Sequence, residues 1–218
     1  MSEKEYQRVL VWSGWLRLSH WTIGLTTLVL LLTGWLIAES PSLARSSLDV
    51  HYLAAGILVS GLIVRIALMF IGQEHEHLTA LIPASSEFKA GAETLRFYIS
   101  LGKMPLPRWY AQNPLWKPLY LLIYLVLLVQ VASGAVMHNQ PIIYGFYLPS
   151  VHAWWAQALF WFSVFHIAAV SLHDGRGKTA DISAMLSGFR LFSIDRDRLQ
   201  GADEERVQFV SLDKLKRR

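Results

Sequence analysis

Four histidines lie within or at the edge of long apolar stretches of the sequence. An ionisable side chain is costly inside a membrane, so each of them indicates a functional site. His152 and His166 are 14 residues apart in one stretch, close to four helical turns, which places both on nearly the same face about 21 Å apart. His20 and His51 lie near the starts of two earlier stretches. Because neutral imidazole is a common metal ligand, this spacing predicts two stacked metal sites.

The chemistry open to these histidines is limited by the absence of cysteine from the sequence. Without cysteine, the chain holds no disulfide, no iron–sulfur cluster, no thiolate-ligated haem and no thioether-attached c-type haem. A neutral imidazole on each side of a planar iron macrocycle is one of the few ways to satisfy two histidines in an apolar helical bundle. The histidines therefore predict two haem b groups.

The elements that position these histidines are four apolar stretches of membrane-spanning length. Only 17% of the 218 residues are charged and 53% are hydrophobic, whereas soluble domains average roughly 25% charged residues. A helix of about 20 apolar residues crosses a bilayer core. The stretches lie at about residues 18–38, 51–72, 118–137 and 151–172. We therefore expect an all-α integral membrane protein with a four-helix bundle at 1–172 and a cytoplasmic segment at 173–218.

The basic residues set the predicted orientation. Three Lys or Arg residues precede the first stretch, five lie between the second and third, and ten follow the fourth. The two short connections, 39–50 and 138–150, contain only one basic residue between them, Arg45. By the positive-inside rule, both termini and the long connection are cytoplasmic, which gives an up-down-up-down bundle in the bacterial inner membrane. The net charge of +4 thus reflects membrane topology and not a nucleic-acid partner.

This orientation predicts how the histidines pair. The first helix starts inside and the second starts outside, so we expect His20 and His166 to hold an inner haem and His51 and His152 an outer haem. His173, seven residues after His166, is a weaker ligand candidate because it adjoins Asp174 at the water boundary. The third helix contains no buried histidine and is expected to pack as a wall.

Three further residues are candidates for haem contacts. Gly34 follows His20 by 14 residues, and Arg65 follows His51 by the same interval. Gly34 and Gly56 would let a haem edge approach a helix backbone. The Arg65 guanidinium could pair with a haem propionate while its stem reaches toward the membrane interface.

Outside the four stretches, short helices are expected on the cytoplasmic side. The long connection has a helical pattern at 88–101, followed by a proline-punctuated run. Residues 179–190 show the apolar spacing of an amphipathic helix, through Ile182, Met185, Leu186 and Phe189. This helix is expected to lie on the inner membrane surface, followed by a charged tail.

In order and spacing, these motifs resemble the di-haem cytochrome b subunits of bacterial Ni/Fe hydrogenases, whose relatives serve formate dehydrogenases and thiosulfate reductases. The matching segments are Arg17–Trp21, His51–Gly56 with Arg65, the His152–His166 interval, and the inner segments 97–103, 112–114 and 182–190. The resemblance implies two haem b groups and a quinone that reacts beside the inner one. Asn113 matches a quinone-site asparagine of the formate dehydrogenase relatives, and it could also simply form a turn before the third helix.

The expected function is therefore electron transfer between a periplasmic redox partner, such as a hydrogenase small subunit, and the membrane quinone pool. Electron flow toward quinone and electron flow from quinol would use the same haems and the same quinone site. A homodimer is compatible with the sequence. The connection of about 13 residues at 138–150 is shorter than is common in hydrogenase subunits, which leaves the partner open.

Two other functions remain open from the sequence. A stand-alone quinone reductase could oxidise a small donor such as superoxide at the outer haem, but the slightly acidic outer connections favour protein docking over anion steering. A haem-free transporter or proton channel could use a histidine relay. Such proteins more often carry acidic residues at mid-depth, and the four stretches contain no Asp or Glu.

Overall fold

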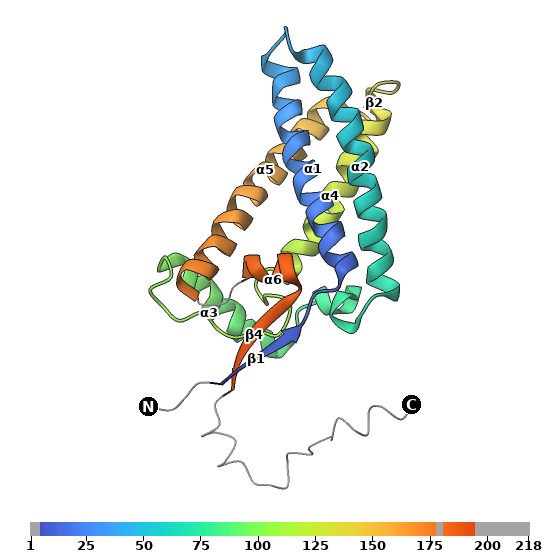
Figure 1. Cartoon of the computed structure of the whole chain (residues 1–218). Helices are drawn as coiled ribbons and strands as arrows, with labels where there is room; N and C mark the ends of the chain where they lie inside the picture. The colour runs from blue at the N-terminus through green and yellow to red at the C-terminus, as the bar shows by residue number, and fades with distance from the viewer. Residues whose placement is uncertain (1–4, 178–180, 195–218) are drawn as a thin grey trace.

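The computed structural model describes residues 5–177 and 181–194. Four long helices alternate in direction along the bundle (Figure 1): α1 Gly14–Glu39, α2 Ala44–Ile71, α4 Lys117–Val136 and α5 Leu148–Leu172. All four are long and apolar enough to cross a membrane. The predicted helical bundle is confirmed.

Local sequence explains where these helices begin. The Ser13 side chain accepts a hydrogen bond from the Leu16 N–H at 3.1 Å and caps α1. Pro118 and Pro149 occupy the first turns of α4 and α5, where a missing N–H costs no helical hydrogen bond. Helix α2 begins at Ala44, so much of the predicted connection 39–50 is helical.

Two short antiparallel sheets, which the sequence did not predict, mark the two ends of the bundle. Strand β1 (Glu5–Leu10) pairs with β4 (Phe189–Ile194), and we call this the strand end. Strand β2 (Ile142–Ile143) pairs with β3 (Phe146–Tyr147), and we call this the hairpin end. The strand end also holds the connection between α2 and α4 and the short helix α6 (Figure 1).

The connection between α2 and α4 is built from short turns and one amphipathic helix. Its elements are η1 Glu74–Glu76, η2 Leu78–Leu81, η3 Ser85–Glu87 and α3 Phe88–Ile99. Helix α3 matches the predicted helical pattern, and it buries Thr94 and Phe97 almost completely. A π-helical turn, η4 His173–Gly177, extends α5.

The predicted amphipathic helix 179–190 is wrong in extent. Helix α6 covers Asp181–Ser187, because Gly188 adopts a left-handed conformation (φ +89°) that ends the helix. A Cβ at Gly188 would lie 2.8 Å from the Trp12 carbonyl oxygen, so the close contact with the segment that follows β1 requires glycine. Phe189 therefore begins β4, and Ala184 is the fully buried residue of α6. Residues 178–180 and the charged tail 195–218 lie outside the described residues.

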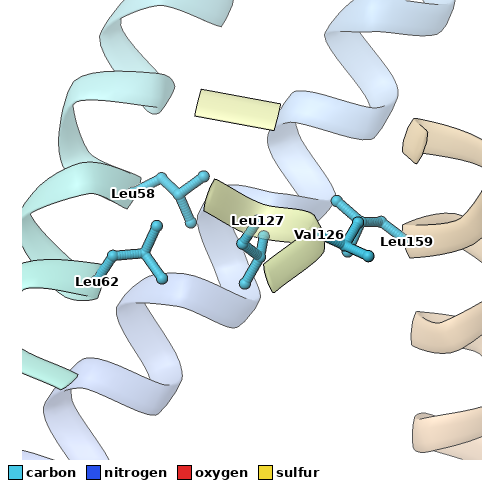
Figure 2. Close-up of a cluster of buried hydrophobic side chains, with 5 residues drawn as sticks. All are labelled: Leu58, Leu62, Val126, Leu127 and Leu159. Atoms are coloured by element: carbon cyan, nitrogen blue, oxygen red, sulfur yellow. The ribbon is translucent and has the colours of Figure 1, made fainter. Parts of the chain in front are cut away.

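The bundle has a small apolar core at mid-depth and an apolar outer surface. Figure 2 shows the core, in which leucines of α2 meet side chains of α4 and α5; its buried members are Leu58, Leu62, Val126, Leu127 and Leu159. Outward-facing side chains such as Leu53, Ile63 and Phe165 are more than 60% exposed. Such a surface fits lipid and not water, as expected of a multi-pass membrane protein.

Candidate functional site

Two histidine pairs lie at opposite ends of the bundle. At the strand end, the ring centroids of His20 on α1 and His166 on α5 are 6.1 Å apart. At the hairpin end, those of His51 on α2 and His152 on α5 are 6.3 Å apart. Each pair joins α5 to a different helix, so both pairs depend on the arrangement of the bundle.

Aromatic rings surround the strand-end pair. Phe162 stacks on the His166 ring at 5.7 Å, and the rings of Trp116 and Tyr120 meet it edge-on at 5.6 and 6.5 Å. The buried Nδ1 of His20 has no hydrogen-bond partner within the described residues. This pair is thus held by packing, without a hydrogen bond to the His20 ring.

Hydroxyl groups contact the hairpin-end pair instead. Nδ1 of His51 lies 2.8 Å from Oγ1 of Thr33 on α1, and Nδ1 of His152 lies 2.9 Å from Oγ of Ser133 on α4. Helix α4 packs in the core through Val126 and Leu127, as expected, and in addition it supplies a hydroxyl to this pair. The sequence reasoning missed both hydroxyl residues, although each directly precedes a glycine, which was the available signal.

The predicted glycines differ in their surroundings. A Cβ at Gly34 would lie 3.7 Å from Cε1 of His51, an ordinary van der Waals contact, whereas a Cβ at Gly56 would meet nothing within 4 Å. Gly34 therefore lies beside the hairpin-end pair, and Gly56 borders open space.

The pair geometry fits a metal bound between two imidazoles. Nitrogen ligands bonded at about 2.0 Å on opposite sides of one metal ion place the two ring centroids roughly 6 Å apart. The observed separations of 6.1 and 6.3 Å agree with this value. Two neutral imidazoles without a thiolate are also a donor set for haem b, so the residues present fit that group.

A cavity of about 350 Å³ adjoins the strand-end pair. His20 and His166 line it together with many apolar side chains, and Arg65 and Asn113 are among its few polar residues. Ligand pockets typically combine apolar walls with a small number of polar groups and measure roughly 300–1,000 Å³. The cavity is therefore suited to a largely apolar molecule with one or two polar atoms.

The two predicted polar residues differ in how their donors are used. Arg65 is 3% exposed; its Nε donates to the Tyr124 hydroxyl and its guanidinium to the Glu76 carbonyl, both at 3.0 Å. Asn113 accepts the Leu115 N–H on its Oδ1 at 3.0 Å. Its buried Nδ2 meets no acceptor at hydrogen-bond geometry among the described residues. The Asn113 amide still acts on the Tyr98 hydroxyl, because it lowers the pKa of that group against the larger effect of burial. Asn113 thus offers the cavity a donor that meets no acceptor in full hydrogen-bond geometry in the described part of the chain.

A hydrogen-bonded network at the wall of the cavity includes His173. Its Nε2 lies 2.8 Å from the Tyr98 hydroxyl, and its Nδ1 lies 3.0 Å from a carboxylate oxygen of Asp181. Both nitrogens of His173 are therefore occupied, which removes it as a competitor to His166. Burial raises the pKa of Tyr98 to about 12, so its hydroxyl stays protonated while it accepts the Trp116 indole N–H at 2.7 Å. No sequence pattern predicts this network, because its members are far apart in the chain.

Comparisons with known proteins agree with this architecture. Three curated proteins, each named a probable Ni/Fe-hydrogenase B-type cytochrome subunit, are similar to the chain. The one from Azotobacter chroococcum mcd 1 is 25% identical over 86% of this chain and 90% of its own length. The one from Cupriavidus necator is 24% identical over 88% and 90%, and the one from Rhodobacter capsulatus is 25% identical over 86% and 83%.

No solved structure gives a significant match to the chain. A family model described as Prokaryotic cytochrome b561 matches residues 11–188, a region that contains both histidine pairs, the cavity and all four long helices. The chain therefore belongs to the prokaryotic cytochrome b561 family, and as a b-type cytochrome of the membrane it binds haem b and transfers electrons.

Proposed function

We propose that this cytochrome carries electrons between a redox protein on the periplasmic side and the membrane quinone pool. Two haem b groups would carry them, one held by His51 and His152 and the other by His20 and His166. The observation that carries the proposal is the position of the two imidazole pairs at opposite ends of one bundle, with a cavity beside the strand-end pair. Along α5, the two ligand positions are about 21 Å apart, most of the thickness of a bilayer core.

Haem b held between two imidazoles supplies one-electron redox chemistry without an open iron position for a substrate. The two histidine pairs would hold these groups, and a haem held by two imidazoles would relay electrons and not react with oxygen. Arg65, at the edge of the cavity, is positioned for a propionate, because charge-assisted hydrogen bonds between guanidinium and carboxylate are strong. Its bonds to Tyr124 and Glu76 fix the guanidinium before any ligand binds.

The quinone is proposed to bind in the strand-end cavity. Its carbonyl oxygen would accept a hydrogen bond from Nδ2 of Asn113, and its ring and tail would lie against the apolar wall. Reduction of a quinone consumes two electrons and two protons. His173 and Asp181 both line the cavity, they are hydrogen-bonded to each other, and the Asp181 side chain is 18% exposed. This pair would supply those protons.

The orientation and the partner follow from the same proposal. By the positive-inside rule, the distribution of basic residues favours a strand end on the cytoplasmic side of a bacterial inner membrane and a hairpin end on the periplasmic side. The redox partner would therefore dock at the hairpin end. The names of the relatives suggest a Ni/Fe hydrogenase as that partner.

The test is to purify the chain in lipid nanodiscs and measure its haem content and its reaction with quinol. We expect about two haem b groups per chain, and we expect the strand-end haem to be reduced when a quinol analogue is added. One haem per chain would contradict the two-site proposal. Two haems that remain oxidised with every quinol, although dithionite reduces them, would contradict the quinone site.

A further inference from the structure

The His51 ring faces two adjacent residues of α1, a hydroxyl residue and a glycine. Thr33 Oγ1 lies 2.8 Å from Nδ1 of His51. The next residue is Gly34, where a Cβ would lie 3.7 Å from Cε1 of the same ring. The hydroxyl thus contacts Nδ1 on one edge of the imidazole. The neighbouring ring carbon, Cε1, lies beside Gly34 on the α1 backbone.

The His152 ring faces the same pair of residue types on a different helix. Ser133 Oγ of α4 lies 2.9 Å from Nδ1 of His152. A Cβ at the following Gly134 would lie 3.2 Å from Cε1 and 3.7 Å from Nδ1 of that ring. The same arrangement therefore occurs twice, on two helices that face the two partners of one histidine pair.

The direction of these hydrogen bonds follows from the single proton of a hydroxyl group. Thr33 Oγ1 lies 2.8 Å from the Val29 carbonyl oxygen, and Ser133 Oγ lies 2.7 Å from the Val129 carbonyl oxygen. Each carbonyl can only accept, so the arrangement that satisfies both contacts of each hydroxyl has the hydroxyl donating its proton within its own helix. The hydroxyl oxygen then accepts from the histidine. Both rings are thus held with hydrogen on Nδ1 and a lone pair on Nε2.

We propose that Thr33, and Ser133 together with Gly134, are positioning residues that fix the tautomer and tilt of His51 and His152, so that Nε2 of each ring is left to bind the iron of the hairpin-end haem. This inference rests on the proposed ligation of haem by that pair. A hydrogen bond from the second ring nitrogen orients a metal-bound histidine and makes it a stronger donor to the metal.

The two ends then differ in redox potential. Stronger donation stabilises oxidised iron, so the hairpin-end haem has a lower reduction potential than it would have without the hydroxyls. At the strand end, Nδ1 of His20 has no such partner within the described residues. This difference favours electron flow from the hairpin end toward the cavity.

The experiment is an optical redox titration of Thr33→Val and Ser133→Ala in nanodiscs, with electron paramagnetic resonance of the oxidised haems. Thr33→Val keeps the shape of the side chain and removes the acceptor. We expect the potential of one haem to shift upward in each variant while the other is unchanged. We also expect the affinity of that site for haem to fall by about 10- to 100-fold, the usual effect of removing the hydrogen-bond partner of a metal-binding histidine. Thr33→Ser and Ser133→Thr should restore the original values.

The matched control is Thr26→Val, on the same helix. Thr26 is 9% exposed, against 6% for Thr33, and its hydroxyl bonds to the Thr22 carbonyl. An equal shift in Thr26→Val and Thr33→Val would overturn the inference, because loss of any buried hydroxyl would then suffice. Unchanged potentials and haem affinity in both Thr33→Val and Ser133→Ala would also overturn it. A wild-type chain with one haem would instead contradict the proposed function itself.

Discussion

The two ends of the bundle hold their histidines by different means. At the hairpin end, hydroxyl groups of neighbouring helices contact both rings, through Thr33 and Ser133. At the strand end, aromatic rings enclose His166, and the pair borders a cavity with the amide donor of Asn113. The hairpin end is thus suited to holding its two histidine rings in one tautomer and one orientation. The strand end combines a redox site with space for a small molecule.

The strongest test of this division is to remove one histidine at a time. His51→Ala or His152→Ala should lower the haem content from about two to about one per chain, and the remaining haem should still react with quinol. His20→Ala should remove the other haem and abolish the quinol reaction. A haemochrome assay checks the content. Loss of both haems in a folded His51→Ala protein would contradict separate sites.

The next effect concerns the cavity at the strand end. Asn113→Ala should slow quinol-dependent haem reduction by roughly tenfold, because one hydrogen bond contributes about 0.5–1.5 kcal/mol, while two haems remain bound. Stopped-flow absorbance measures the rate. Asn113→Asp should keep the turn, since its oxygen still accepts the Leu115 N–H, but it lacks the amide donor. The matched control is Gln112→Ala, whose amide already bonds to the His75 carbonyl at 3.2 Å. Equal rates in the Asn113 variants and the wild type would exclude the role.

The hydrogen-bonded network at the strand end should matter for stability and not for haem potential. Tyr98→Phe would leave the Trp116 indole N–H and His173 without their shared partner. We expect a loss of about 1–3 kcal/mol in the free energy of unfolding, the usual cost of unsatisfied buried polar groups. Denaturation in detergent checks this. A shift in the potential of the hairpin-end haem would show instead that the two ends are coupled.

The glycines of the hairpin end should differ in their tolerance of a methyl group. A Cβ at Gly134 would come within 3.2 Å of the His152 ring, tighter than most contacts, whereas the distance at Gly34 is an ordinary 3.7 Å. Gly134→Ala should therefore alter the haem spectrum at the hairpin end, and Gly34→Ala should change it little. Absorbance spectra of the two reduced variants provide the comparison. A larger effect at Gly34 would contradict the measured spacing.

The smallest expected effect is the pH dependence of a surface ion pair at the strand end. Burial raises the pKa of Glu87, but hydrogen bonds from Lys117 and the Ala84 N–H outweigh it, so the net pKa lies below its usual value. The pair therefore stabilises the fold fully above the unfolded-state pKa of about 4.3, and this contribution is lost as pH falls through the lower native value. Glu87→Gln should cost less than about 1 kcal/mol at pH 7. Its difference from the wild type should vanish in acid, as followed by thermal unfolding.

Much of the architecture could be predicted because it depends on local composition. Apolar length fixed the four spans, and the order of the helices predicted which histidines share a depth. The prediction for 179–190 was wrong because apolar spacing alone does not reveal that Gly188 turns left-handed against the Trp12 carbonyl. Strands β1 and β4 were missed for a related reason, since each pairs only with the distant end of the chain.

The sequence by itself determined the membrane class, the number of spanning helices and the histidines that could meet, because hydropathy and helical periodicity act within one segment. Only the tertiary structure decided that hydroxyls of α1 and α4 contact one histidine pair, and that Tyr98 and Asp181 occupy both nitrogens of His173. These contacts join residues on different elements, and their distances depend on how the helices are rotated and packed. No pattern within a single segment specifies that rotation.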